Sequence, residues 1–325
     1  ADRVPEHLPP EIALILFTSG SSGEAKGVML SRQALLASAR ASAECLGWCG
    51  DDRWLCALPL SHIGGLSILL RSLADRKTVY LCEGFETEKV ASLILAEAVT
   101  HISLVPTMLW RLLESGFQAP PHLRVTMVGG AALDSNLALR ASEAGFSLRQ
   151  SYGMTETASQ IITDGRPLPG VELRIRNERL EIKAPMLMHG YLPPHDQEPC
   201  IDQGWFCSRD RALIDEEGSV QILGRSDDTI ISGGENIDPR LVESVLNLSP
   251  CVRASYALGL PHQEWGQKLV ALVVLAPGAR VKDIELSALR RHQVPKELSP
   301  VAQLPLLESG KVNKQRAQAL AAGPL

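Results

Sequence analysis

The feature that most limits the fold of this chain is a repeated alternation of short apolar segments with longer amphipathic ones, from Glu11 to about Thr157. The short segments are bounded by Gly, Pro or charged residues, as buried strands are. The longer ones carry apolar residues at helical spacing, and Ser31 and Asp134 are suited to cap two of them. The alternation predicts an α/β fold, with helices on both faces of a parallel-rich sheet and ligands at the C-terminal ends of its strands. The predicted strands are residues 12–17, 54–58, 78–81, 101–105 and 125–128, and the predicted helices are residues 31–46, 65–73, 86–98, 107–114 and 134–144.

The second part of the chain follows another pattern. Residues 171–182 and 204–223 are rich in turn residues and alternate in polarity, which predicts antiparallel hairpins. A new unit begins after them, with predicted helices at 239–248 and 284–292 and predicted strands at 254–258 and 269–275. We therefore expect a large domain at 1–224 that is β-rich from about residue 165, a boundary at 225–228, and a small α+β domain at 229–325.

Bulk properties exclude several classes of function. The net charge of −5 and the sequence pI near 5.9 give no basic surface for nucleic acid. The 7 cysteines are scattered and the 8 histidines show no HxxxH or HExxH spacing, so we expect neither a disulfide framework nor a zinc site. No apolar run is long enough for a membrane span, and no signal peptide is recognisable. These features predict a cytoplasmic protein without membrane insertion.

A segment rich in Gly, Ser and Thr follows the first predicted strand directly, at residues 16–27 (LFTSGSSGEAKG). Its glycines let backbone N–H groups approach an anion, its hydroxyls add donors, and its lysine adds positive charge. It is not a Walker A loop, because no Gly-Lys-Ser/Thr ends it. A flexible turn is the alternative, but so many donors directly after a strand favour a polyphosphate-binding loop. The assigned phosphate-binding residues are Thr18, Ser19, Gly20, Ser21, Ser22, Gly23 and Lys26.

Five further segments follow this loop along the chain: 129–132 (GGAA), 151–157 (SYGMTET), 205–210 (WFCSRD), 224–228 (GRSDD) and 309–311 (SGK). Together with the loop they resemble, in the same order, the signatures of the adenylate-forming superfamily. That superfamily includes acyl- and aryl-CoA ligases, luciferases and peptide-synthetase adenylation domains. The resemblance implies an ATP-dependent, AMP-forming carboxylate–CoA ligase that uses ATP, Mg²⁺ and coenzyme A.

The resemblance also implies roles for single residues. Glu156 would hold Mg²⁺, Thr155 would contact the phosphates, and Lys311 would neutralise the charge that builds up during adenylation. Asp210 would accept hydrogen bonds from the ribose hydroxyls, and Arg225 would help on the same sugar. Besides the phosphate loop, the implied ATP-binding residues are Gly129, Gly130, Ala131, Ser151, Tyr152, Gly153, Met154, Asp210 and Arg225.

The small C-terminal domain would rotate between the two half-reactions of such a ligase. Asp227 would be the hinge for this rotation. In the second orientation, Gly233, Gly234 and Glu235 would line the path of the CoA thiol.

Two segments, 58–66 (LPLSHIGGL) and 104–113 (LVPTMLWRLL), resemble the o-succinylbenzoate–CoA ligases of menaquinone biosynthesis. The triplet that ends at Asp210 is Ser-Arg-Asp where the superfamily more often has Thr-Gly-Asp, and this variant points the same way. A small aromatic acid is the implied substrate. Another aryl- or acyl-CoA ligase, or an enzyme that acylates a carrier-protein thiol, stays open. The implied substrate-binding residues are His62, Gly64, Gly65, Ser159 and Gln160.

The chain departs from the family at its start, since only 17 residues precede Thr18 where family members have a whole N-terminal subdomain. We therefore expect exposed apolar surface, which favours a partner chain or a homo-oligomer. A truncated, non-catalytic adenylate-binding protein is a third hypothesis. Retention of Lys26, Glu156, Asp210, Arg225 and Lys311 argues against it.

Overall fold

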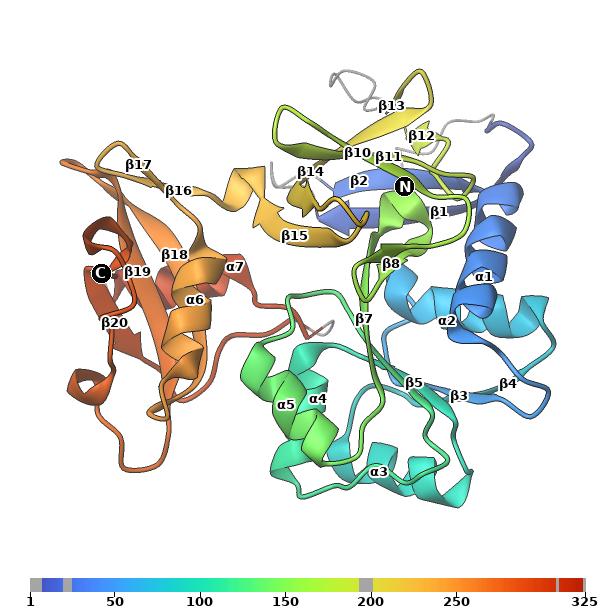
Figure 1. Cartoon of the computed structure of the whole chain (residues 1–325), viewed down its shortest axis with the longest axis horizontal. Helices are drawn as coiled ribbons and strands as arrows, with labels where there is room; N and C mark the ends of the chain where they lie inside the picture. Colours follow the sequence, from blue (N-terminus) through green and yellow to red (C-terminus); the bar gives the residue numbers. More distant parts are fainter. Residues whose placement is uncertain (1–7, 20–24, 193–200, 308–309, 324–325) are drawn as a thin grey trace. The chain divides into compact units, whose positions relative to one another are not determined.

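The computed structural model describes residues 8–19, 25–192, 201–307 and 310–323 (Figure 1). The chain forms two compact units, Ala1–Ile222 and Leu223–Leu325, each with its own hydrophobic core. The predicted fold class is confirmed: a parallel-rich sheet with flanking helices, a β-rich region and a C-terminal α+β region. Among the helices of the described residues, none combines the length and the apolarity that a membrane crossing requires.

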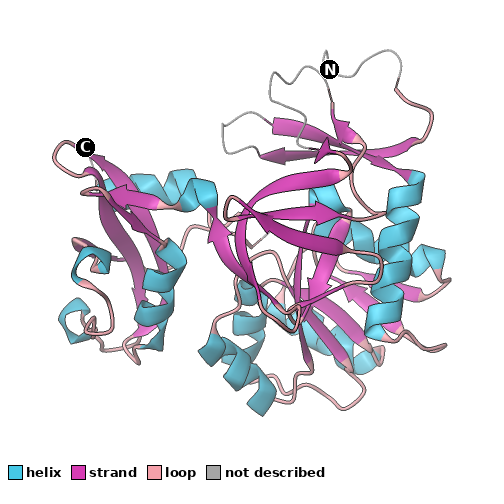
Figure 2. Cartoon of the chain, turned by 45° about the horizontal axis from the view of Figure 1, so that its top comes forward, coloured by secondary structure: helices cyan, strands magenta, loops and turns pink. Residues whose placement is uncertain are grey.

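The largest sheet has seven strands in the order β4-β3-β5-β6-β7-β8-β9. Figure 2 shows the strands in magenta and the helices in cyan. The pairs from β4 to β7 are parallel, and β8 and β9 continue the sheet in antiparallel fashion. The C-terminal ends of the parallel strands therefore lie along one edge of the sheet. At this edge the predicted motif at 129–132 follows β6, and the motif at 151–157 begins in the last residues of β7. The strands are β3 (Arg53–Cys56), β4 (Thr78–Leu81), β5 (His101–Leu104), β6 (Val125–Val128), β7 (Leu148–Met154), β8 (Ser159–Thr163) and β9 (Arg166–Pro167).

Helices cover both faces of this sheet because strand residues alternate between them. On one face, Leu55, Ile102 and Val128 form a core cluster with residues of α3, α4 and α5. On the other, Trp54 and Met127 pack with residues of α1 and α2. The predicted caps are confirmed, since the side chains of Ser31 and Asp134 accept backbone N–H groups of the helices that they precede. The helices are α1 (Arg32–Leu46), α2 (Ile63–Ala74), α3 (Thr87–Ala96), α4 (Pro106–Glu114) and α5 (Ser135–Glu143).

The first predicted strand does not belong to the parallel sheet, and this expectation was wrong. It is β1 (Ile12–Ser19), which pairs antiparallel with β2 (Ala25–Ser31), and β2 pairs in turn with β12 (Gly190–Tyr191). Only five residues separate β1 from β2, whereas a parallel connection needs a dozen or more. The phosphate loop therefore connects two strands of a hairpin.

The β-rich region has the strand order β10-β11-β14-β13, with β15 paired to β14. Its hairpin β10–β11 confirms the pattern at 171–182. Its core is shared with α1 and with the β1–β2 hairpin, since Leu180, Ile182 and Phe206 cluster with Val28 and Ala41. The strands are β10 (Glu172–Arg176), β11 (Arg179–Lys183), β13 (Ile201–Asp202), β14 (Trp205–Ile214) and β15 (Val220–Arg225), and a 3-10 turn η1 (Thr155–Thr157) joins β7 to β8.

The C-terminal unit is an α+β fold, as predicted, with strand order β17-β16-β19-β18 and β20 parallel to β19. The predicted helix at 284–292 is wrong. Short turns replace it, in which Leu289 N–H bonds Leu286 O, and Arg290 N–H bonds the side chain of Gln293. Such local bonds compete with a helix. The elements are η2 (Ser226–Asp228), β16 (Ile230–Ser232), β17 (Glu235–Ile237), α6 (Pro239–Leu248), β18 (Val252–His262), β19 (Gly266–Leu275), η3 (Val281–Asp283), η4 (Arg291–Gln293), β20 (Glu297–Pro300) and α7 (Lys314–Ala322).

Candidate active site

The β1–β2 hairpin brings the two ends of the predicted phosphate loop together. Thr18 and Lys26 are direct partners in the register, and the Thr18 hydroxyl lies 3.5 Å from the Lys26 carbonyl oxygen. The Lys26 ammonium lies 5.3 Å from the ring centre of Tyr191 on β12. The predicted residues Gly20, Ser21, Ser22 and Gly23 lie outside the described residues, and Ser19 is described only as the last residue of β1.

The predicted nucleotide-binding residues after β6 and on β7 lie close together, and Asp210 of the predicted ribose pair contacts them. A Cβ on Gly129 would lie 3.1 Å from the Ser151 carbonyl oxygen, so glycine allows the two segments to approach closely. At Gly153 a Cβ would lie 1.9 Å from the carbonyl oxygen of Ser159, which only glycine avoids. The Tyr152 hydroxyl donates a hydrogen bond of 2.6 Å to Asp210 on β14. The remaining predicted residues here are Gly130 and Ala131 after β6 and Met154 at the end of β7.

Glu156, the predicted metal ligand, follows Thr155 in the 3-10 turn after β7. The Tyr191 hydroxyl donates to its Oε1 at 2.8 Å, and the Met188 N–H donates to its carbonyl oxygen at 2.8 Å. Within the described residues, its Oε2 accepts no hydrogen bond, and no cluster of three His, Cys, Asp or Glu residues could hold a metal. One carboxylate with an open oxygen fits Mg²⁺, which proteins bind through one or two carboxylates plus substrate phosphates and water.

The backbone is strained just after Glu156. Ala158 and Ser159 have φ values of 49° and 103°, a region that non-glycine residues rarely adopt. Strain of this kind gathers at functional sites. The Ser159 hydroxyl bonds that of Ser67 on α2 at 3.1 Å.

The other predicted acid-binding residues differ in their exposure. Gln160 is 1% exposed, and its amide bonds the hydroxyls of Ser42 and Thr163, so the side chain is engaged within the core. His62 is exposed at the N-cap of α2. A Cβ on Gly65 would lie 2.4 Å from the Pro59 carbonyl oxygen, so this turn requires glycine, and Gly64 precedes it in the first turn of the helix.

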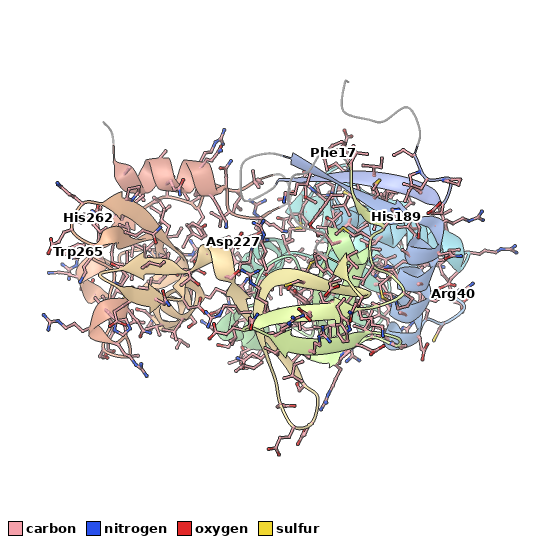
Figure 3. The ribbon with its side chains drawn as sticks, turned by 90° about the horizontal axis from the view of Figure 1, so that it is seen from above. Phe17, Arg40, His189, Asp227, His262 and Trp265 are labelled. Carbon is pink, nitrogen blue, oxygen red and sulfur yellow. The ribbon has the colours of Figure 1, made fainter. Side chains whose placement is uncertain are left out.

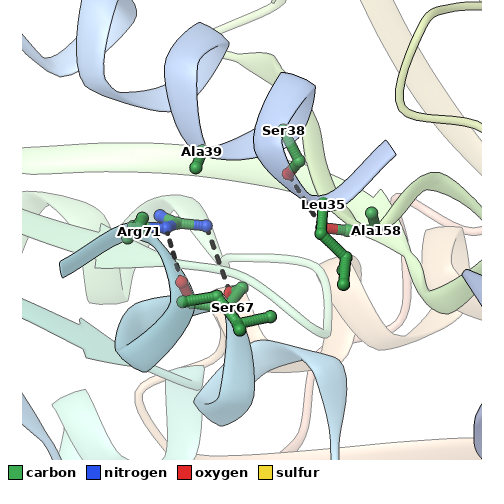
Figure 4. Close-up of a pocket in the computed structure, with 7 residues that line it drawn as sticks. Leu35, Ser38, Ala39, Ser67, Arg71 and Ala158 are labelled. Atoms are coloured by element: carbon green, nitrogen blue, oxygen red, sulfur yellow. Dashed lines mark hydrogen bonds between the residues drawn. The ribbon is translucent and has the colours of Figure 1, made fainter. Parts of the chain in front are cut away.

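Arg71 on α2 is a buried cation that the sequence reasoning did not single out. Its side chain is 2% exposed, and its Nε and Nη2 donate to the carbonyl and hydroxyl oxygens of Ser67, each at 3.1 Å (Figure 4). Its guanidinium lies 5.1 Å from the ring centre of Trp54. Among the described residues, its Nη1 has no hydrogen-bond partner and no carboxylate forms an ion pair with it. Burial lowers the pKa of Arg71 to about 10, so the side chain remains charged at neutral pH.

This guanidinium borders a small pocket between α1, α2 and the start of β8. The pocket is small, with about 10 Å³ available to the centre of a water-sized sphere, which is room for about one water molecule. The side chains of Ser38 and Ser67 bring hydroxyls to it. A buried cation without a counter-ion is costly, so an anionic group that entered here would be bound favourably. The lining residues are Leu35, Ser38, Ala39, Ser67, Leu70, Arg71 and Ala158.

The remaining predicted residues lie at turns of the C-terminal unit. Lys311 follows Gly310 in a turn closed by a Leu306–Val312 bridge. Gly233 and Gly234, with φ of 61° and 84°, join β16 to Glu235 in β17, and the Gly233 N–H bonds the Trp265 carbonyl oxygen. Trp265 stacks on His262 with ring centres 4.4 Å apart (Figure 3). Arg225 binds both carboxylate oxygens of Asp227, at 2.8 and 3.0 Å.

Comparison with known proteins gives a consistent family. Residues 2–192 match the family model of the AMP-binding enzymes, and residues 241–311 match that of the AMP-binding enzyme C-terminal domain. The chain is 36% identical to 2-succinylbenzoate–CoA ligase of Staphylococcus aureus (strain MSSA476) over 94% of its own length. It spans 66% of that relative, so about a third of the relative has no counterpart here.

Solved structures agree with this comparison. The chain resembles o-succinylbenzoate CoA synthetase from Bacillus subtilis, in complex with the acyl-adenylate OSB-AMP, with a TM-score of 0.84 and 34% identity over 94% of this chain and 68% of that one. The ATP-bound RpMatB-BxBclM chimera B1 has a TM-score of 0.86 and 30% identity over 95% of this chain and 68% of that one. The chain therefore belongs to the AMP-binding enzyme family.

Proposed function

We propose that this chain is an ATP-dependent, AMP-forming carboxylate–CoA ligase, and that its acid is a small aromatic dicarboxylate, with o-succinylbenzoate of menaquinone biosynthesis as the first candidate. The family membership supports the reaction class. The observation that carries the acid is the buried guanidinium of Arg71 beside a pocket. One carboxylate of such an acid would be activated while the other, still charged, binds Arg71.

The first half-reaction has to overcome repulsion between a carboxylate and a triphosphate. Lys26 and the hydroxyls of Thr18 and Thr155 would bind the phosphates, and Asp210 would orient the ribose. Mg²⁺ held by Glu156 would supply charge neutralisation at the phosphate oxygens. Lys311 would act where negative charge develops on the α-phosphate, which lowers the barrier more than it strengthens binding.

The second half-reaction brings a thiol to the acyl-adenylate. The turn of Gly233 and Gly234 has no side chains, so it could border a narrow path for the pantetheine arm after rotation about Asp227. Two structures of relatives support the cofactors and co-substrate: one holds ATP and a magnesium ion, and one holds the product analogue OSB-NCoA.

The direct test is mass-spectrometric detection of the CoA thioester from o-succinylbenzoate, ATP, Mg²⁺ and CoA. We expect the thioester with AMP and pyrophosphate. Thioesters from monocarboxylic acids alone would contradict the proposed acid. ATP binding without pyrophosphate exchange for any acid in a broad panel would contradict the ligase and favour a non-catalytic adenylate-binding protein. If the acyl group of the adenylate were transferred only to a carrier-protein thiol, that thiol and not CoA would be the acceptor.

A further inference from the structure

A short segment, residues 188–192, connects the phosphate hairpin to the turn that holds Glu156. On one side, the N–H groups of His189 and Leu192 donate to the carbonyl oxygens of Met29 and Gly27 on β2, at 2.8 and 2.7 Å. At its start, the Met188 N–H donates to the carbonyl oxygen of Glu156 at 2.8 Å. The segment thus fixes the backbones of two elements that lie far apart in the sequence.

Tyr191 repeats this connection with its side chain. Its hydroxyl donates to Oε1 of Glu156 at 2.8 Å, and the face of its ring lies 5.3 Å from the Lys26 ammonium. Its backbone pairs with Val28, two residues after Lys26. One side chain therefore contacts both the predicted metal ligand and the predicted phosphate-binding lysine.

We propose that Tyr191 is a positioning residue for Mg–ATP, which holds the Glu156 carboxylate and the Lys26 ammonium in one fixed arrangement. The hydroxyl occupies one carboxylate oxygen of Glu156, so that the other would be left for Mg²⁺. The ring attracts the lysine ammonium through its π-electrons and limits where it can lie. Groups that orient a metal ligand in this way contribute to metal affinity without touching the metal. This inference rests on the proposed use of Mg–ATP at Glu156.

The two contacts are separable by substitution. Tyr191→Phe removes the hydroxyl but keeps the ring below Lys26, whereas Tyr191→Leu removes both. Nucleotide affinity is measured by titration calorimetry with α,β-methylene-ATP, once with Mn²⁺ and once with EDTA. We expect Tyr191→Phe to reduce the metal-dependent gain in affinity roughly 10-fold and to leave the metal-free affinity unchanged. Tyr191→Leu should also weaken the metal-free affinity, roughly 3-fold, because the lysine loses its ring partner.

Tyr80→Phe is the matched control, because the Tyr80 hydroxyl also bonds a carboxylate, that of Glu97, on strand β4 away from the site. It should leave both affinities at the wild-type values. Wild-type affinities for Tyr191→Phe would overturn the proposal, and so would a lowered melting temperature with an unchanged gain from Mn²⁺. The titration uses neither acid nor CoA, so its outcome is independent of whether the chain activates o-succinylbenzoate.

Discussion

Each unit of the molecule contains a buried or half-buried side chain, arginine in one and glutamate in the other, that forms no ion pair among the described residues, and the two differ in their charge at neutral pH. In the N-terminal unit, Arg71 remains charged, because its pKa falls only to about 10. In the C-terminal unit, burial raises the pKa of Glu243 on α6 to about 8, so at neutral pH the acid is mostly protonated. The Ala257 N–H bonds its Oε1 at 2.9 Å.

We take this difference to separate a proposed binding residue, Arg71, from a structural one, Glu243. A carboxyl can escape the cost of burial by taking up a proton, whereas a guanidinium cannot readily lose one. Glu243 avoids the cost of a buried charge by remaining protonated, without any ligand. The Nη1 of Arg71 has no hydrogen-bond partner among the described residues and Arg71 borders a pocket, so we propose that its charge serves a ligand. A buried ionisable group is therefore informative about binding only when protonation cannot neutralise it.

The largest expected effect concerns another cation, Lys311, which we propose acts on the rate whereas Arg71 acts on binding. Lys311→Ala should slow adenylate formation roughly 10²- to 10³-fold, because its charge is needed as pyrophosphate leaves. Thioester formation from supplied acyl-adenylate should be unchanged. Pyrophosphate exchange and single-turnover thiolation measure the two steps, with exposed Lys282→Ala as the control. Equal loss of both steps would refute this division between rate and binding.

Replacing Arg71 by an apolar side chain tests whether its charge serves the fold. Arg71→Met should raise the free energy of unfolding by roughly 1–3 kcal/mol, because an unpaired buried charge is removed. Chemical denaturation followed by circular dichroism measures the change. Arg40→Met, at an exposed position of α1, should stay within about 0.5 kcal/mol of wild type. Strong destabilisation by Arg71→Met alone would show that Arg71 is structural, as Glu243 is.

The third prediction concerns Glu243 and appears as pH dependence. Its pKa is higher in the fold than in the unfolded chain, so its contribution to stability is fully present below about pH 4.5 and is lost as the pH rises through about 8. Between pH 5 and pH 9, the wild-type melting temperature should therefore fall more than that of Glu243→Gln. Calorimetry at both pH values measures this. Parallel curves for the two proteins would show that the acid is already ionised in the fold.

The sequence predicted those parts of the fold that local pattern encodes. Local pattern was sufficient to predict buried strands such as 101–105 and 125–128 and the capped helix starts at Ser31 and Asp134. These predictions did not require the contacts of distant residues. The placement of β1 was missed because the pattern of a strand does not say which strand it pairs with. The helix at 284–292 failed because side-chain hydrogen bonds within the segment compete with helical ones.

The candidate site residues also fall into those that local motifs indicate and those that only distant contacts reveal. Motif residues such as Glu156 and Asp210 could be proposed from the sequence because they belong to recognisable segments. From its residue type alone, Arg71 would be assigned to the solvent-exposed face of an amphipathic helix. Its position three residues after Ile68 was a signal that it shares the buried face. Tyr191 gave no signal, since its importance comes from contacts with residues 35 and 165 positions away.

The central claim, that Arg71 binds the carboxylate that is not activated, is tested most directly by two acids and two proteins. The acids are o-succinylbenzoate and 3-benzoylpropionate, which keeps the oxobutanoate chain but lacks the ring carboxylate. The proteins are wild type and Arg71→Met, and kcat/KM is measured by acid-dependent pyrophosphate exchange. We expect wild type to prefer the dicarboxylate by roughly 100-fold, and Arg71→Met to lose most of that preference. An equal preference in both proteins would contradict the account.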